Sequence, residues 1–143
     1  MVLFSAQESS VLVSGLESSA VDVFSEPESS VLDLTVMANI RSLGGPGEPD
    51  VYMEVAQLFL ADVPINLTAL GAAIAAQSVE SVEKIAHRLR GGALEMGALR
   101  MAPLCAAIEQ AARDGSLEHA AARAESLDRE FAATRAALEQ ATQ

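Results

Sequence analysis

One stretch decides the fold of this chain: residues 78–97, SVESVEKIAHRLRGGALEMG. Its apolar residues recur at intervals of three and four, the spacing that places side chains on one face of an α-helix. These residues are Val82, Ile85, Ala86, Leu89, Ala93 and Met96. Ser78 is a suitable N-cap and Gly97 a suitable C-terminal stop. The stretch therefore predicts an amphipathic helix that ends near Met96, with one buried face and one exposed face.

Further helices are predicted on both sides of this stretch. A short first helix covers about residues 32–43 and stops at the glycine-rich residues 44–47, and a second follows Asp50 as N-cap to about residue 76, where Pro64 bends it without ending it. Later helices cover about residues 99–113 and, after Ser116 as N-cap, residues 117–139. Short connections make successive helices antiparallel. We predict an all-α fold, an antiparallel up-and-down four-helix bundle with a short extra N-terminal helix.

The first thirty residues differ in composition from the rest. They hold nine serines and a loose repeat, ESSVL at residues 8–12, ESSAV at 17–21 and ESSVL at 28–32. We interpret residues 1–30 as an acidic, serine-rich linker or tail that is largely irregular, with a partner-binding tail as the alternative, and residues 31–143 as the helical bundle.

Charge and cysteine content exclude several classes of protein. Nine basic and 20 acidic side chains give a net charge of −11, which disfavours general nucleic-acid binding. Cys105 is the only cysteine, so an intrachain disulfide or a cysteine-based zinc site cannot form, and we expect it to be a small core residue of a cytoplasmic protein. The longest uncharged run, residues 63–79, contains proline, asparagine and glutamine, so we expect no membrane span.

His87 lies nearly opposite the apolar face of residues 78–97, where Lys84, Arg88 and Arg90 supply positive charge. Gly91, one turn further on, costs about 1 kcal/mol relative to alanine inside a helix, which suggests that a partner approaches closely there. A neutral imidazole offers an Nε2 lone pair as a nucleophile toward phosphorus. The alternatives are an exposed histidine without a role, a solvated charged face and a packing glycine. His119 stands far from His87 in sequence, so the two do not predict a metal site.

Residues 87–98, HRLRGGALEMGA, resemble the signature of histidine-containing phosphotransfer (HPt) domains of bacterial multistep phosphorelays. The residues that agree are His87, Leu89, Gly91, Ala93, Gly97 and Ala98. Arg90 stands where the family usually has lysine, and Gly92 where it has serine or alanine. The resemblance extends over roughly residues 31–140.

The resemblance implies that His87 accepts the phosphoryl group, that Arg90 stabilises it and that Glu109 orients the histidine ring. Spacing alone places Glu109 at the edge of an apolar stripe, so the alternative that Glu109 is an ordinary surface glutamate stays open. The partner surface would use Gly91, Leu94 and Ala98, with Lys84, Arg88 and Arg90 as its polar rim.

Three functions remain at this point. The first is a phosphorelay intermediate that carries a phosphoryl group between the aspartates of response-regulator receiver domains. It would not be an enzyme, because the receivers supply the transfer chemistry, and a hybrid sensor histidine kinase is a further candidate partner. Such a protein would be a monomer without a cofactor of its own, and Mg²⁺ would sit on the receiver. The second is a non-catalytic adaptor that binds a receiver without phosphotransfer. The third, an independent histidine-dependent enzyme, lacks a second catalytic group.

Overall fold

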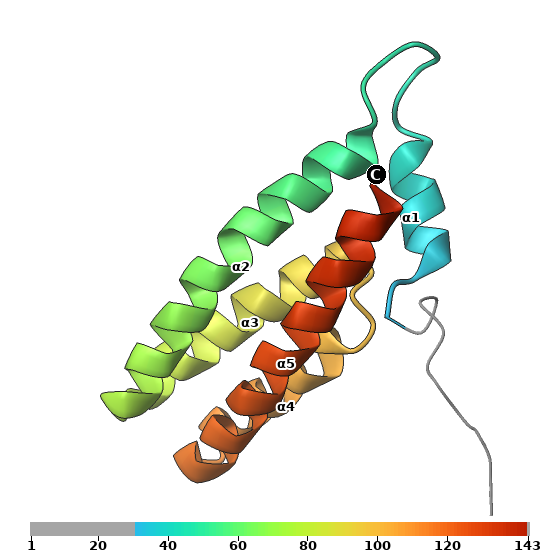
Figure 1. Ribbon diagram of the computed structural model, residues 1–143. Helices are drawn as coiled ribbons and strands as arrows, with labels where there is room; N and C mark the ends of the chain where they lie inside the picture. Colours follow the sequence, from blue (N-terminus) through green and yellow to red (C-terminus); the bar gives the residue numbers. More distant parts are fainter. Residues whose placement is uncertain (1–30, 143) are drawn as a thin grey trace, which may run out of the picture.

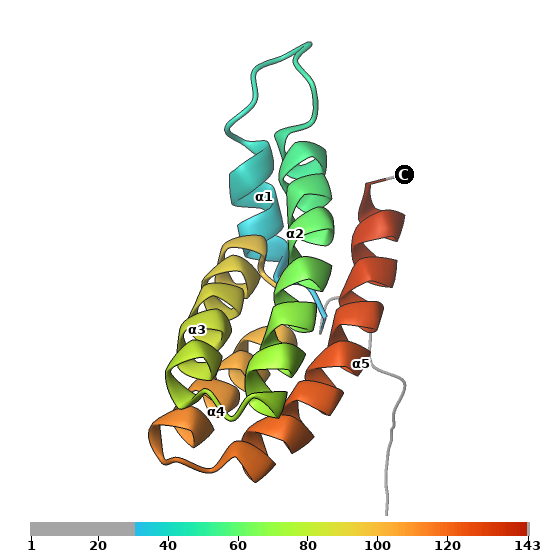
Figure 2. The same cartoon turned by 90° about the vertical axis from the view of Figure 1, so that its left-hand side faces the viewer.

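The computed structural model describes residues 31–142, and within this range the secondary structure consists of helices (Figure 1). The helices are α1 (Leu34–Arg41), α2 (Val51–Ala75), α3 (Val79–Met96), α4 (Met101–Arg113) and α5 (Leu117–Ala141). Helices α2 to α5 form an antiparallel bundle in which α3 packs against α2 and α4, and α5 packs against α4 and α2. The short α1 lies beside the start of α2 at one end of the bundle (Figure 2). The predicted fold class is confirmed. Residues 1–30 lie outside the described residues, so their interpretation as a linker stays a prediction.

Helices α1 and α4 begin later than predicted, because the segment just before α1 pairs through its backbone with the segment just before α4. The first helix starts at Leu34 because Asp33 caps it. The Asp33 carboxylate accepts hydrogen bonds from the backbone N–H groups of Thr35 at 2.9 Å and Val36 at 3.3 Å. Just before it, Leu32 forms an antiparallel bridge with Ala98. The N–H of Leu99 donates to the carbonyl of Val31 at 2.9 Å, so α4 starts at Met101 and not at residue 99.

The predicted N-cap residues occupy their positions, but only one caps with its side chain. The Asp50 carboxylate accepts a hydrogen bond from a backbone N–H of the first turn of α2 at 3.0 Å. Ser78 and Ser116 make no such bond; their hydroxyls lie 2.8 Å from Ser81 Oγ and 2.9 Å from His119 Nδ1. Helices α3 and α5 therefore start at these serines without a side-chain cap hydrogen bond.

The core is built from the inward faces of all four long helices. Phe59 of α2 and Phe131 of α5 meet edge to face with ring centroids 6.3 Å apart. Cys105 is fully buried on α4, and burial raises the pKa of its thiol to about 12, which agrees with a packing role. The residues predicted for the inward face of α3 are buried at Val82, Ala86, Leu89, Ala93 and Met96.

Helix α2 is apolar enough to raise the question of a membrane. Among the described residues, it is the one helix whose length and composition would allow it to cross a bilayer. It runs unbroken through Pro64, as predicted, and buries Tyr52, Phe59, Val63 and Leu70 in the bundle core. A core helix of a bundle passes the same test, so this finding is weak evidence for a span.

Gly97 is required where α3 ends, because its backbone is left-handed at φ +77°. A Cβ at this position would lie 3.1 Å from Cβ atoms of both Asp33 and Val36, at the start of α1. The Gly97 carbonyl also accepts the Asp33 N–H at 2.8 Å. The absence of a side chain therefore lets the first helix lie against the end of α3.

We predict that Gly97→Ala lowers the free energy of unfolding by about 2 kcal/mol, since a left-handed alanine is strained and its Cβ is crowded. Urea unfolding followed by circular dichroism measures the change. Gly71→Ala is the matched control: Gly71 is an exposed glycine inside α2 whose Cβ would meet no atom within 4 Å. That control should stabilise the protein by up to about 1 kcal/mol. Equal effects of both changes would contradict the role given to Gly97.

Candidate functional site

His87 stands on the outward face of α3, away from the core. Its side chain is 71% exposed, and its Nδ1 atom lies 3.0 Å from Oε2 of Glu109 on α4. An ionised carboxylate only accepts hydrogen bonds, so Nδ1 carries the proton and donates the hydrogen bond to Glu109 Oε2. A neutral ring in that tautomer carries its lone pair on Nε2. The structure thus presents a solvent-facing histidine whose second nitrogen is a nucleophile.

Glu109 is a buried carboxylate held from both oxygens. It is only 2% exposed; Arg90 Nη1 donates to Oε1 at 2.9 Å, and Arg113 Nη2 donates to Oε2 at 2.8 Å. Burial by itself raises the pKa of Glu109, but hydrogen bonds from Arg90 and His87 and the charge of Arg113 outweigh burial and hold the pKa below its usual value. The carboxylate therefore stays ionised under the histidine ring.

The structure brings together the three residues to which the sequence assigned the chemistry, His87, Arg90 and Glu109. The alternative of an ordinary surface glutamate is wrong, because Glu109 is among the most buried side chains of the bundle. Arg90 is 41% exposed and points its guanidinium to Glu109, so the residue expected to stabilise phosphate also supports the residue beneath the histidine.

The surroundings of His87 are mixed in charge and not simply cationic as the sequence suggested. Lys84 pairs with Glu80 at 3.6 Å on the surface, and Arg88 Nη1 donates to Asn66 Oδ1 of α2 at 3.2 Å. An open hollow of about 520 Å³ lies beside His87, and acidic and basic side chains line it: Glu80, Glu83, Lys84, Arg88, Glu109 and Arg113. Both signs of charge line it, so the local charge depends on which of these groups are paired.

Two of the three expected docking residues are accessible. Gly91 is exposed, and a Cβ built there would meet nothing within 4 Å, while Leu94 is 57% exposed. Ala98 is fully buried, so its assignment to the partner surface is wrong. Helical spacing placed it near the His87 face, but the helix ends at Met96 and Leu32 covers Ala98 by backbone pairing.

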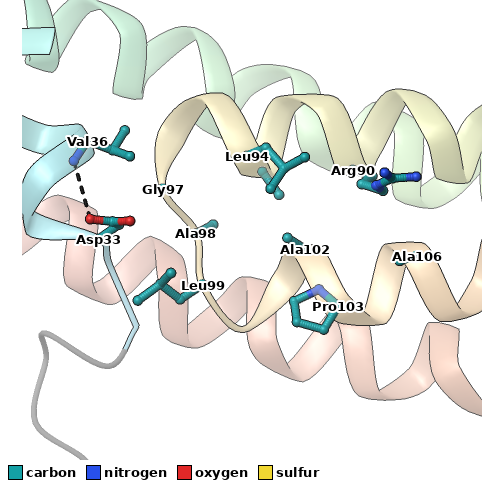
Figure 3. A pocket seen from close by; sticks show the side chains of 11 residues that line it. Asp33, Val36, Arg90, Leu94, Gly97, Ala98, Leu99, Ala102, Pro103 and Ala106 are labelled. Atoms are coloured by element: carbon teal, nitrogen blue, oxygen red, sulfur yellow. Dashed lines mark hydrogen bonds between the residues drawn. The ribbon is translucent and has the colours of Figure 1, made fainter. Parts of the chain in front are cut away.

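An apolar groove continues from Leu94 along the seam between α3 and α4 (Figure 3). Its volume is about 410 Å³, and Leu99, Ala102 and Pro103 lie across it from Leu94. On α2, Leu58 is 71% exposed. Apolar surface is thus accessible on both sides of the outward face of α3.

Sequence reasoning assigned no role to two residues of the site, Arg113 and Glu83. Arg113 Nε donates to Glu83 Oε2 at 2.6 Å while its Nη2 holds Glu109. The spacing of four residues between Glu109 and Arg113 was an available signal, since such residues share a helix face. Within residues 31–142, no group of three or more histidine, cysteine or acidic side chains is arranged to hold a metal ion.

An all-α bundle that presents a histidine over a buried carboxylate defines a class of proteins, and comparison with known proteins identifies the family. The sequence profile of the Hpt domain matches residues 54–141. The structure is similar to histidine-containing phosphotransfer protein B from Pseudomonas aeruginosa PAO1, with 33% identity, a TM-score of 0.73 and coverage of 79% of this chain and 95% of the other. The chain belongs to the Hpt domain family, whose members carry out histidine phosphotransfer in phosphorelays.

Two plant phosphotransfer proteins share the fold at lower identity. MtHPt2 from Medicago truncatula has 20% identity and a TM-score of 0.71, with coverage of 79% of this chain and 78% of the other. ZmHP2 from maize has 22% identity and a TM-score of 0.67, with coverage of 80% and 89%. No curated protein sequence gives a significant match. Proteins of the family interact with receiver domains and kinases in phosphorelays.

We predict that Glu109→Gln destabilises the bundle by about 1–3 kcal/mol at pH 7, because two arginines lose a buried anionic partner. The folded-state pKa of Glu109 lies below its usual 4.5, so its contribution is complete above that pH and disappears as pH falls through the folded-state value. Chemical denaturation of both proteins between pH 7 and pH 3 measures the difference. Glu125→Gln, at an exposed glutamate of α5, is the control and should change stability by less than about 0.5 kcal/mol. A difference for Glu109→Gln that does not shrink in acid would contradict the assignment.

Proposed function

We propose that this chain is a phosphorelay intermediate in which His87 accepts a phosphoryl group from a receiver-domain phosphoaspartate and donates it to the aspartate of another receiver. One observation carries the proposal: an exposed imidazole has its Nδ1 on a buried, ionised carboxylate, which leaves Nε2 facing solvent as the nucleophile. Membership of the Hpt domain family supports the same chemistry.

The transfer step balances without a redox partner or a proton donor. The Nε2 lone pair of His87 forms the N–P bond, and the P–O bond to the partner's aspartate breaks with its electron pair leaving on the carboxylate. The Nδ1 proton stays on the ring, where Glu109 accepts its hydrogen bond and balances the positive charge that the ring gains. Reversal of the same step passes the phosphoryl group to the next aspartate.

In this proposal the chain presents the histidine and the receiver supplies the remaining machinery. Mg²⁺ and the acidic pocket belong to the receiver, so the chain needs no cofactor of its own and is an intermediate, not a kinase. Arg90 holds Glu109 and adds a positive charge close to the transferred group.

The partner surface in this proposal is apolar around the histidine and charged at its edge. Gly91 leaves room for a loop of the partner, Leu94 and Leu58 supply exposed apolar contacts, and Lys84 and Arg88 form the rim. A small interface of this kind gives the modest affinity that a relay needs in order to release its partner.

Phosphotransfer from a panel of receiver domains, each labelled with a small phosphodonor, tests the proposal. We expect at least one receiver to transfer an acid-labile label to the full chain and to His119→Gln, and none to label His87→Gln. Labelling of His87→Gln would exclude His87 as the acceptor. Binding of a receiver without any transfer would instead establish the adaptor function.

We predict that Gly91→Glu lowers the rate of phosphotransfer by roughly tenfold or more, the effect of losing about 1.4 kcal/mol of docking energy. The introduced carboxylate occupies open space, so helicity should be kept, and it would face an acidic receiver pocket. Gly71→Glu places the same side chain at an exposed position of α2 and should transfer at the wild-type rate. Normal transfer by Gly91→Glu would remove Gly91 from the docking surface.

A further inference from the structure

Arg113 reaches the site from the last turn of α4 and connects two acidic residues. Its Nη2 donates to Glu109 Oε2 at 2.8 Å, and its Nε donates to Glu83 Oε2 on α3 at 2.6 Å. The side chain is half exposed, while Glu109 is buried and Glu83 is 35% exposed. One guanidinium therefore spans from the surface of α3 to the carboxylate beneath His87.

The geometry uses both oxygens of Glu109. Oε1 accepts from Arg90, and Oε2 accepts from both His87 Nδ1 and Arg113 Nη2. A carboxylate held from one oxygen alone is free to rotate about its last torsion, whose preference is broad. With Arg113 on the second oxygen, the atom that accepts the hydrogen bond from His87 Nδ1 is held in place. Glu83 in turn holds the guanidinium through a separate nitrogen.

Charge balance gives Arg113 a second effect on the histidine. Arg90 and Arg113 carry two positive charges, and Glu83 and Glu109 carry two negative charges, so this network is neutral when the ring is neutral. Loss of Arg113 would leave one net negative charge beside His87, which favours the protonated ring and repels an incoming phosphoryl group. The charged groups that surround His87 are Glu80, Glu83, Lys84, Arg88 and Arg90 on α3, Glu109 and Arg113 on α4, and Asp62 on α2, which acts through Asn66 and Arg88.

We propose that Arg113 is a positioning residue for phosphotransfer through His87, and that Glu83 holds it there and balances its charge. The inference rests on the proposed function, because it assigns a role in the same reaction. Arg113 acts through Glu109, to which its Nη2 donates. Arg113 and Glu83 thus determine which nitrogen of His87 carries the lone pair and over which pH range that lone pair is available.

The test compares Arg113→Gln, Arg113→Lys and Glu83→Gln with the wild-type chain, using one phosphorylated receiver as donor and measuring the rate of label transfer from pH 5 to pH 9. Arg113→Gln should slow transfer by about tenfold, in line with the loss of other groups that orient a reactive histidine. It should also move the acid limb of the profile to higher pH by roughly half a unit. Glu83→Gln leaves one net positive charge and should move the limb to lower pH.

Two controls separate this role from a general effect on folding or charge. Arg113→Lys keeps the positive charge and its favourable place at the end of α4, so the acid limb should stay near its wild-type position while the rate falls by a smaller factor. Arg123→Gln removes the same charge from an exposed position on α5, which packs against α2 and α4, and should leave both rate and profile unchanged. Circular dichroism checks that each variant is folded.

The ring titration of His87 measured by NMR gives a readout that does not need phosphotransfer, with the signal assigned by its loss in His87→Gln. Its midpoint should move up in Arg113→Gln and down in Glu83→Gln. Midpoints that stay in place, or move in the same direction in both variants, would overturn the role of Arg113. If the wild-type chain accepts no label from any receiver, the proposed function is wrong, and the titration still decides whether Arg113 and Glu83 control the ring.

Discussion

The site depends on one buried carboxylate. Glu109 is almost fully removed from solvent, and burying an unpaired anion would cost several kcal/mol. It is tolerated because His87, Arg90 and Arg113 all donate to it, and these donors come from two neighbouring helices. The same requirement that satisfies the anion therefore fixes the histidine ring and joins the outward faces of α3 and α4.

Helix α3 keeps packing and chemistry on separate faces. Its inward side is apolar, with small residues such as Ala86 and Ala93 that allow close contact with its neighbours. Its outward side carries His87 and, one turn later, the open surface at Gly91. Because only one face contributes to the core, substitutions on the other can change partner recognition while the bundle stays folded.

The helices and the inward faces were predictable because their causes are local. Apolar periodicity, the carboxylate cap at Asp50 and the left-handed stop at Gly97 each act within a few residues. Predictions failed where distant segments meet. Leu32 was assigned to a helix but pairs with Ala98, and Ala98 was assigned to a docking surface that this pairing covers.

The sequence by itself determined a helical bundle, the placement of His87 on an exposed helix face and, through its resemblance to HPt domains, the chemistry to expect there. Only the tertiary structure decided that Glu109 is buried, that Arg113 links it to Glu83, and that Arg90 points to it. The physical reason is that helical periodicity defines directions around a single helix axis. Which side chains meet across two helices depends on how those helices pack, and that information is not local in the chain.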